Sequence, residues 1–118
     1  MQRPPRSRHL LILAVVLSSL LALTACAQEI ALPDDADDEL ILGSEIYRAS
    51  CARCHGADGA GGIGVSLRGV TDRLNDVEQR EVVVGGRNRM PAFGATLSES
   101  DIEAVVRYQR EILSGTDG

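Results

Sequence analysis

The first long apolar stretch of the chain lies near its amino end, where residues 10–23 carry no charged side chain. Three arginines precede this stretch, at positions 3, 6 and 8. A basic start followed by an apolar run is typical of an export signal, and the run is shorter than the roughly 20 residues that a membrane-spanning helix needs. We therefore expect residues 1–25 to be a cleaved signal peptide, with a short uncleaved anchor as the alternative.

Two helices are predicted in the middle of the chain. From Glu39 to about Cys51, apolar residues recur at intervals of three and four, which is the helical period. The next helix is predicted to start after Asn75, with Glu78 as its capping partner, and to end near residue 84 before a Gly-Gly pair. The three valines at the end of this second segment would also suit a strand.

The last helix has the clearest pattern. Ser98 and Asp101 form a capping pair, and an apolar stripe follows them. Residues 56–70 and 87–97 lack such a period and are predicted to be loops, the first of them rich in glycine. Together these segments predict an all-α fold of three to four helices, in a domain that spans residues 39–115.

Residues 26–38 differ in composition from the helices that follow. They include a proline and four aspartates, whose like charges keep a segment extended and solvated. We expect this segment to be a flexible acidic tether between the signal and the domain. Its acids also suit the positive amino end of the first helix.

Composition limits both the core and the partners. The 118 residues carry 12 basic and 17 acidic side chains, a net charge of -5, which argues against binding to nucleic acid. Removal of 25 residues would leave 118 − 25 = 93, and the whole chain has two tyrosines, one phenylalanine and no tryptophan. A chain this small buries a limited core. We therefore expect disulfides, a metal or a prosthetic group to complete the interior.

Cys26 ends the apolar run, in the sequence Leu23-Thr24-Ala25-Cys26. This sequence resembles the lipobox of bacterial lipoproteins, in which small residues precede a cysteine that is lipidated and becomes the first residue. The resemblance implies a membrane anchor at Cys26. Ordinary signal cleavage after Ala27 is the alternative, because a small residue also lies on each side of the cysteine.

The sequence Cys51-Ala52-Arg53-Cys54-His55 carries the strongest chemical signal. Its two thiols and its imidazole are spaced i, i+3 and i+4, so one helical turn places them on the same side. This is the pattern for attachment of a c-type haem, in which the thiols form thioethers and the imidazole binds the iron. A thioredoxin-like thiol pair would need a βαβ context, and a zinc site would need a second cysteine pair.

Met90 is the candidate for the second axial ligand of the iron. Apart from Met1 it is the only methionine, and His55 is the only histidine after residue 25. Cytochromes c usually pair methionine with histidine at the iron. Pro91 stiffens the surrounding loop, which argues against the alternative of a methionine used only for packing. We also expect Met90 to bound one cavity together with the two cysteines and the histidine.

Nearly all of the domain resembles the small monohaem class I cytochromes c of bacteria. In that family a glycine and an aromatic residue precede the first haem cysteine at intervals of four, as Gly43, Tyr47 and Cys51 do here. The first helix of the family crosses the last one at this glycine, against an aromatic and an aliphatic residue that Tyr108 and Val105 match. The resemblance implies a cytochrome c-like fold wrapped around one covalently attached haem.

The loop after the haem motif departs from the family pattern. The family usually carries Gly-Pro before a leucine, and the residue there accepts a hydrogen bond from the proximal histidine, whereas this chain has Gly64-Val65-Ser66-Leu67. We expect a backbone carbonyl of Gly64 or Val65 to orient His55 instead. Four arginines flank the expected pocket and could supply a partner for a haem propionate: Arg68, Arg73, Arg87 and Arg89.

The resemblance implies an electron carrier rather than an enzyme, since iron held by both His55 and Met90 leaves no position for a substrate. The expected place is the outer face of a bacterial membrane, with a lipid anchor at Cys26. The implied partners are membrane respiratory complexes, namely a quinol-oxidising complex and a terminal oxidase. The alternatives are a haem c subunit of a periplasmic dehydrogenase, a five-coordinate haem sensor or peroxidase-like protein, and a non-haem thiol-disulfide protein.

Overall fold

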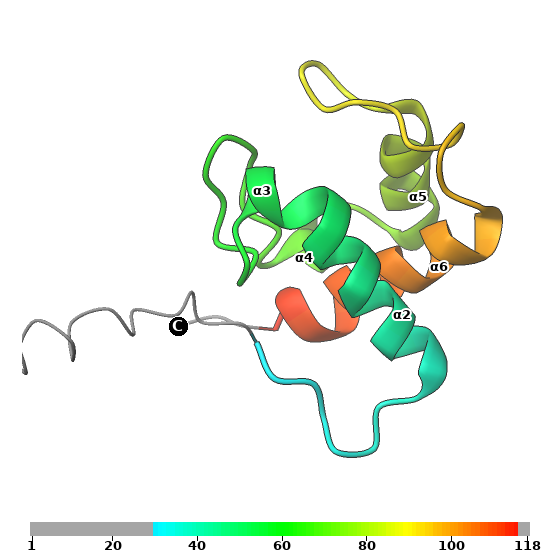
Figure 1. Cartoon of the computed structure of the whole chain (residues 1–118). Helices are drawn as coiled ribbons and strands as arrows, with labels where there is room; N and C mark the ends of the chain where they lie inside the picture. Colours follow the sequence, from blue (N-terminus) through cyan, green and yellow to red (C-terminus); the bar gives the residue numbers. More distant parts are fainter. Residues whose placement is uncertain (1–29, 116–118) are drawn as a thin grey trace, which may run out of the picture.

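The computed structural model describes residues 30–115, and this part of the chain is built from helices and the loops between them (Figure 1). The elements, in chain order, are α2 (Asp38–Ile46), a π-helical turn (Tyr47–Cys51), α3 (Ala52–His55), α4 (Val70–Arg73), α5 (Asp76–Gly85), α6 (Glu99–Tyr108) and a second π-helical turn (Gln109–Leu113). The first three form one continuous helical segment, and α6 continues into the last turn. The predicted all-α fold is thus confirmed.

Side-chain caps begin the three longer helices. Asn75 and Glu78 form the predicted capping box of α5, and Ser98 and Asp101 form that of α6. The Asp37 carboxylate accepts a 2.9 Å hydrogen bond from the first turn of α2, so this helix begins one residue earlier than predicted. The strand alternative for the valines of α5 is wrong, because the cap and the glycines that follow define a helix there.

The helices α2 and α6 cross at Gly43. A Cβ atom placed on Gly43 would overlap the carbonyl oxygen of Ala104 and come within 2.9 Å of the Tyr108 Cβ. Beside the crossing, the rings of Tyr47 and Tyr108 lie with their centroids 5.4 Å apart, at 46° to each other. The predicted crossing is confirmed, and its physical reason is a backbone approach that only glycine permits.

Two hydrophobic clusters share α6. The first cluster consists of Leu40, Tyr47, Cys51, Leu67, Val105, Tyr108 and Leu113. The second cluster consists of Val83, Ile102 and Val106, with Met90, Phe93 and Leu97 packed against it. The adjacent residues Val105 and Val106 are 0% and 1% exposed, so α6 is covered on two faces. This helix therefore joins the part of the domain that carries Cys51 to the part that carries Met90.

The π-helical turns and α4 are not predicted by the apolar pattern. The first π turn replaces the α-helical turn predicted before Cys51, and in it the backbone N–H of Ala52 donates to the carbonyl of Tyr47. Wide turns of this kind occur often at functional sites. This one sets the start of α3, the helix that carries Cys54 and His55.

Residues 30–37 form an arm that runs along the domain before α2 (Figure 1). Ile30, Leu32 and Ala36 pack against the first cluster, while the aspartates of the arm are exposed. The described part of the predicted tether therefore already contacts the domain. The predicted signal peptide and Cys26 lie outside the described residues, and the domain boundaries remain predictions. Within residues 30–115, no helix has both the length and the apolar character needed to cross a membrane.

Candidate haem-binding site

Cys51, Cys54 and His55 lie together at the end of the first helical segment. Cys51 ends the π turn, and α3 supplies the other two side chains. Both thiols are free; Cys51 is buried in the first cluster, and Cys54 is half-buried. The structure thus brings the three residues of the predicted motif into one turn.

A backbone carbonyl orients the His55 ring. The Nδ1 atom lies 2.7 Å from the carbonyl oxygen of Val65. With its proton on Nδ1 and donated to this carbonyl, the imidazole keeps the lone pair of Nε2 for a metal. The prediction that Gly64 or Val65 supplies the carbonyl is confirmed, and the acceptor is Val65.

The glycine-rich loop lies directly against this ring. A Cβ atom on Gly64 would come within 2.9 Å of Cε1 and 3.0 Å of Nδ1 of His55. The Gly64 N–H donates to the carbonyl of Cys54 (2.7 Å), and the Gly61 N–H donates to the carbonyl of His55 (2.8 Å). Gly61 has a φ of +100°, which a residue with a side chain rarely adopts. The predicted loop is confirmed, and its glycines let its backbone approach the imidazole closely.

Tyr47 ties this loop to the first helical segment. Its side chain is 1% exposed, and its hydroxyl donates a 2.7 Å hydrogen bond to the carbonyl of Gly56. Burial raises the pKa of Tyr47 well above its ordinary value, so the hydroxyl stays protonated and remains a donor. The hydroxyl of Tyr47, the aromatic residue that matches the family pattern, therefore fixes the backbone at Gly56, directly after His55.

Two separate observations disfavour the thiol-disulfide and zinc alternatives. Burial, with a smaller contribution from Cys54, raises the pKa of Cys51 to about 11. The thiolate is the reactive form in disulfide exchange, so a thiol that keeps its proton at neutral pH is poorly suited to that reaction. For zinc, residues 30–115 contain no group of three or more His, Cys, Asp or Glu side chains that could hold a metal ion.

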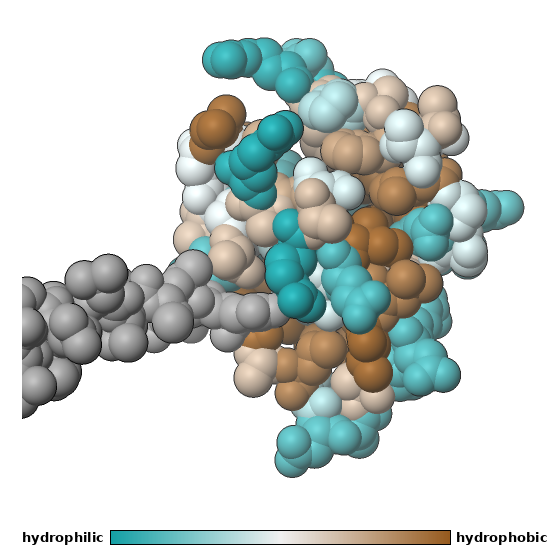
Figure 2. Space-filling view, in the orientation of Figure 1, coloured by the Kyte–Doolittle hydropathy of each residue, from teal (hydrophilic) through white to brown (hydrophobic). Residues whose placement is uncertain are grey.

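Apolar side chains are exposed beside the histidine loop. Ile63 is 79% exposed and Val65 is 73% exposed, on either side of Gly64. Figure 2 shows apolar surface next to polar side chains around the loop beside α3. Exposed apolar side chains grouped at one place mark a surface that contacts another molecule or a bound group.

Met90 lies on a different loop, residues 86–94, at the end of α5 (Figure 1). Its backbone exchanges two hydrogen bonds with Arg87, of 2.9 and 3.2 Å. Its partly buried side chain packs against the second cluster. The structure therefore holds Met90 apart from the turn of Cys51, Cys54 and His55, on a loop anchored to its own cluster.

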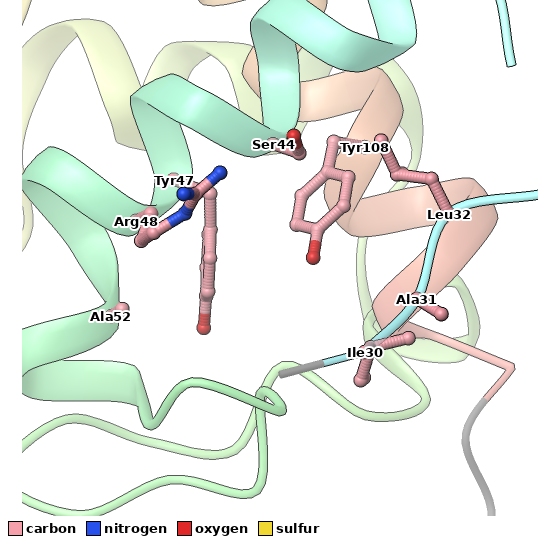
Figure 3. A pocket seen from close by; sticks show the side chains of 8 residues that line it. All are labelled: Ile30, Ala31, Leu32, Ser44, Tyr47, Arg48, Ala52 and Tyr108. Carbon is pink, nitrogen blue, oxygen red and sulfur yellow. The ribbon is translucent and has the colours of Figure 1, made fainter. Parts of the chain in front are cut away.

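Two surface pockets of about 350 Å³ each lie elsewhere on the domain. One lies between the arm and the tyrosine pair, and in Figure 3 Ile30 faces the hydroxyl ends of Tyr47 and Tyr108. The other is lined by charged side chains of α2, α5 and the last helical segment. Neither is bounded by the two cysteines, His55 and Met90, so the predicted shared cavity is not found at these two places.

Two of the four flanking arginines are engaged within the domain. Arg68 pairs with Asp58 at 2.7 Å, and Arg73 donates to backbone carbonyls at 2.7 and 3.0 Å. Arg87 and Arg89 are exposed on the loop of Met90, and their side chains make no ion pair or hydrogen bond with residues 30–115. Of the four candidate arginines, these two are therefore the ones whose side chains could pair with a haem propionate.

Comparison with known proteins agrees with this geometry. Residues 38–108 match the family model described as Cytochrome C oxidase, cbb3-type, subunit III. Cytochrome c6 of Petalonia fascia is 36% identical, over 56% of this chain and 84% of that protein. The solved structure of the c-type cytochrome XoxG from Methylobacterium extorquens AM1 has a TM-score of 0.60 at 27% identity, over 76% of this chain and 62% of that one. The structure of dihydro-heme d1 dehydrogenase NirN in complex with DHE has a TM-score of 0.55 at 35% identity, over 58% of this chain and 15% of that one.

The family implies covalent haem c, and the donors in this structure fit that group. Two free thiols and an imidazole with its Nδ1 already engaged lie on one turn, which is the set that a c-type haem requires. The fold, the motif and the relatives thus agree. The chain is a c-type cytochrome of the family described as Cytochrome C oxidase, cbb3-type, subunit III, and it carries electrons rather than catalysing a reaction.

Proposed function

We propose that this protein transfers single electrons through one haem that is held by Cys51, Cys54, His55 and Met90. The observation that carries the proposal is the hydrogen bond from His55 to Val65, on the same turn as two free thiols. When bound, the haem supplies an iron that alternates between the ferric and ferrous states.

Each residue has a distinct task in this proposal. Cys51 and Cys54 would hold the haem covalently, each through a thioether bond between its sulfur and one vinyl group. The carbonyl of Val65 orients His55 and raises the basicity of its Nε2. The sulfur of Met90 would be the second protein ligand of the iron, and because a soft thioether favours ferrous iron it would raise the reduction potential.

The test replaces Met90 by alanine in the protein that carries haem. Haem should remain on the chain in a denaturing gel, because the thioethers do not depend on Met90. The sulfur-to-iron charge-transfer band of the oxidised form should vanish, the reduction potential should fall, and the reduced form should bind carbon monoxide.

Leu97→Ala is the matched control, since Leu97 packs against the same second cluster. It should keep the band and exclude carbon monoxide. An unchanged spectrum in Met90→Ala would remove Met90 from the iron and favour the five-coordinate sensor or peroxidase-like alternative. Haem extracted by acid acetone from the wild-type protein would contradict covalent attachment.

We further propose that the protein works at the outer face of a bacterial membrane, anchored through Cys26. The sequence Leu23-Thr24-Ala25-Cys26 supports the anchor. The family description supports partners in respiration, where a quinol-oxidising complex would supply electrons and a terminal oxidase would accept them. Cys26→Ser should move the protein from the membrane to the soluble fraction with its haem content unchanged. A mature amino terminus at Gln28 would show ordinary cleavage instead.

A second candidate is a haem c subunit of a periplasmic dehydrogenase. The likeness to dihydro-heme d1 dehydrogenase NirN favours it, because this chain covers 15% of that longer protein and so resembles one part of it. Affinity capture of the protein from membranes, followed by haem staining and identification of the bound proteins, separates the two candidates. Recovery of a dehydrogenase in place of a respiratory complex would support the second.

A further inference from the structure

The loop that carries Met90 also caps helix α5. The Phe93 N–H donates to the carbonyl of Val83 (3.0 Å), and the Gly94 N–H donates to the carbonyl of Val84 (3.1 Å). Both carbonyls belong to the last turn of the helix, where no partner exists within the helix itself. These two hydrogen bonds supply partners for carbonyls that would otherwise be unpaired. They also attach the end of the loop, at Phe93 and Gly94, to the last turn of α5.

Gly86 is the residue at which the chain leaves α5 and turns into this loop. Its φ of +71° and ψ of 171° lie in a region essentially restricted to glycine. A Cβ atom there would lie 2.6 Å from the carbonyl oxygen of Met90, 2.9 Å from the nitrogen of Ala92 and 3.0 Å from the carbonyl carbon of Pro91. All three are backbone atoms, so no side-chain rotation can relieve the contact. The backbone of residues 90–92 thus passes Gly86 at a distance that only glycine permits.

The tip of the loop is closed by its own backbone. The Met90 N–H donates to the carbonyl of Arg87 at 2.9 Å, and the Arg87 N–H donates back to Met90 at 3.2 Å. Asn88, between them, has a φ of +53°, which asparagine tolerates better than most residues. These contacts, together with the second cluster, fix the position of the Met90 backbone from inside the protein.

We infer that Gly86 is a positioning residue for the distal iron ligand, because its contact with residues 90–92 sets where the Met90 sulfur stands. This inference rests on the proposed function. A side chain at position 86 must push the Met90 backbone away, so the sulfur would leave the iron for part of the time. The apparent affinity of the iron for an external ligand should then rise in proportion to the open fraction.

The experiment compares Gly86→Ala with Gly85→Ala, both as holoproteins. Gly85 is the adjacent residue, yet an added Cβ there meets no atom within 4 Å, and its φ is not positive. Gly86→Ala should keep its covalent haem, lose most of the sulfur-to-iron band, and bind carbon monoxide in the reduced form at least about tenfold more tightly than the wild type. Gly85→Ala should match the wild type in both measurements.

Gly94→Ala provides a second variant in case Gly86→Ala does not accumulate with haem. A Cβ there would meet the Val84 Cγ1 at 2.9 Å and the Val84 carbonyl oxygen at 3.1 Å, which disturbs the other anchor of the loop. It should weaken the band and raise carbon monoxide affinity relative to Gly85→Ala. Wild-type values in every variant that binds haem would overturn the inference. A wild-type protein without the band would instead overturn ligation by Met90, so the two failures are distinguishable.

Discussion

Single glycines permit two of the closest contacts in this domain. Gly43 lies under Ala104 of α6, and Gly64 lies against the ring of His55. The first contact could be predicted, because a glycine, an aromatic residue and a haem cysteine at intervals of four resemble a known crossing. The second could not, because a glycine-rich loop has no periodicity from which its path over the imidazole follows.

Gly43→Ala should lower the free energy of unfolding by about 1–3 kcal/mol, because the new methyl group forces α2 and α6 apart. Denaturant titration of the holoprotein measures this change. Gly85→Ala is the control, since it adds the same group in open space and should change stability by at most about 1 kcal/mol, in the stabilising direction. Equal stability of the two variants would show that the crossing tolerates a side chain.

A buried pair of glutamines joins α5 to the last helical segment. Gln79 and Gln109 are 3% and 4% exposed, and the Nε2 of the first donates to the Oε1 of the second at 2.7 Å. Arg110 donates to the Oε1 of Gln79 at 3.0 Å, so both amides have partners. Because the loop of Met90 is anchored on α5, this polar contact also supports the candidate distal ligand.

Gln79→Ala should destabilise the protein by about 1–3 kcal/mol, because it leaves the buried amide of Gln109 without its partner. Thermal unfolding followed by circular dichroism measures the effect. Glu81→Ala, at an exposed position of the same helix, should have little effect. Replacement of both glutamines by leucine should recover part of the loss, and no recovery would show that the cost comes from packing rather than from the unpaired amide.

At the scale of elements, local signals could be predicted and tertiary ones could not. The capping boxes at Asn75 and Ser98 depend on residues three positions apart, so the sequence contains them in full. The glutamine pair joins residues 30 positions apart, a contact that apolar spacing does not encode. The same spacing also does not distinguish a π turn from an α-helical turn. The candidate site follows the same rule. The haem motif consists of five consecutive residues and could be read from the sequence, whereas only the folded loop shows that Val65, and not Gly64, accepts the hydrogen bond from His55.

The arm before α2 is fastened to the domain by charge as well as by apolar contacts. Both carboxylate oxygens of Asp37 accept hydrogen bonds from Nη1 of Arg107, at 2.8 and 2.9 Å. This guanidinium holds the pKa of Asp37 below its ordinary value of 3.8. Because the pKa of Asp37 is lower in the folded state than in the unfolded state, the contact stabilises the protein fully at pH values above 3.8. The stabilisation is lost as the pH falls through the lowered pKa.

Asp37→Asn should therefore lower the melting temperature slightly at neutral pH, and the difference from the wild type should shrink as the pH falls below 3.8. Asparagine is also a good helix cap, so this change removes the charge and retains the cap. Asp35→Asn changes an exposed acid of the same arm and should have no comparable effect. Equal melting temperatures of Asp37→Asn and the wild type at neutral pH would assign the role of Asp37 to capping alone.

The course of the arm places both ends of the described domain together. Ile30 and Leu32 pack against the same first cluster as Leu113 and Ile112, and in Figure 1 the two coloured ends of the chain lie next to each other, away from the loop of Met90. Domains with neighbouring ends tolerate insertion into longer chains and circular permutation. A short linker between residues 115 and 30 could therefore close this domain into a ring, with new ends opened at an exposed loop. For the same reason such a domain can form one part of a longer chain, with both of its connections on the side away from the loop of Met90.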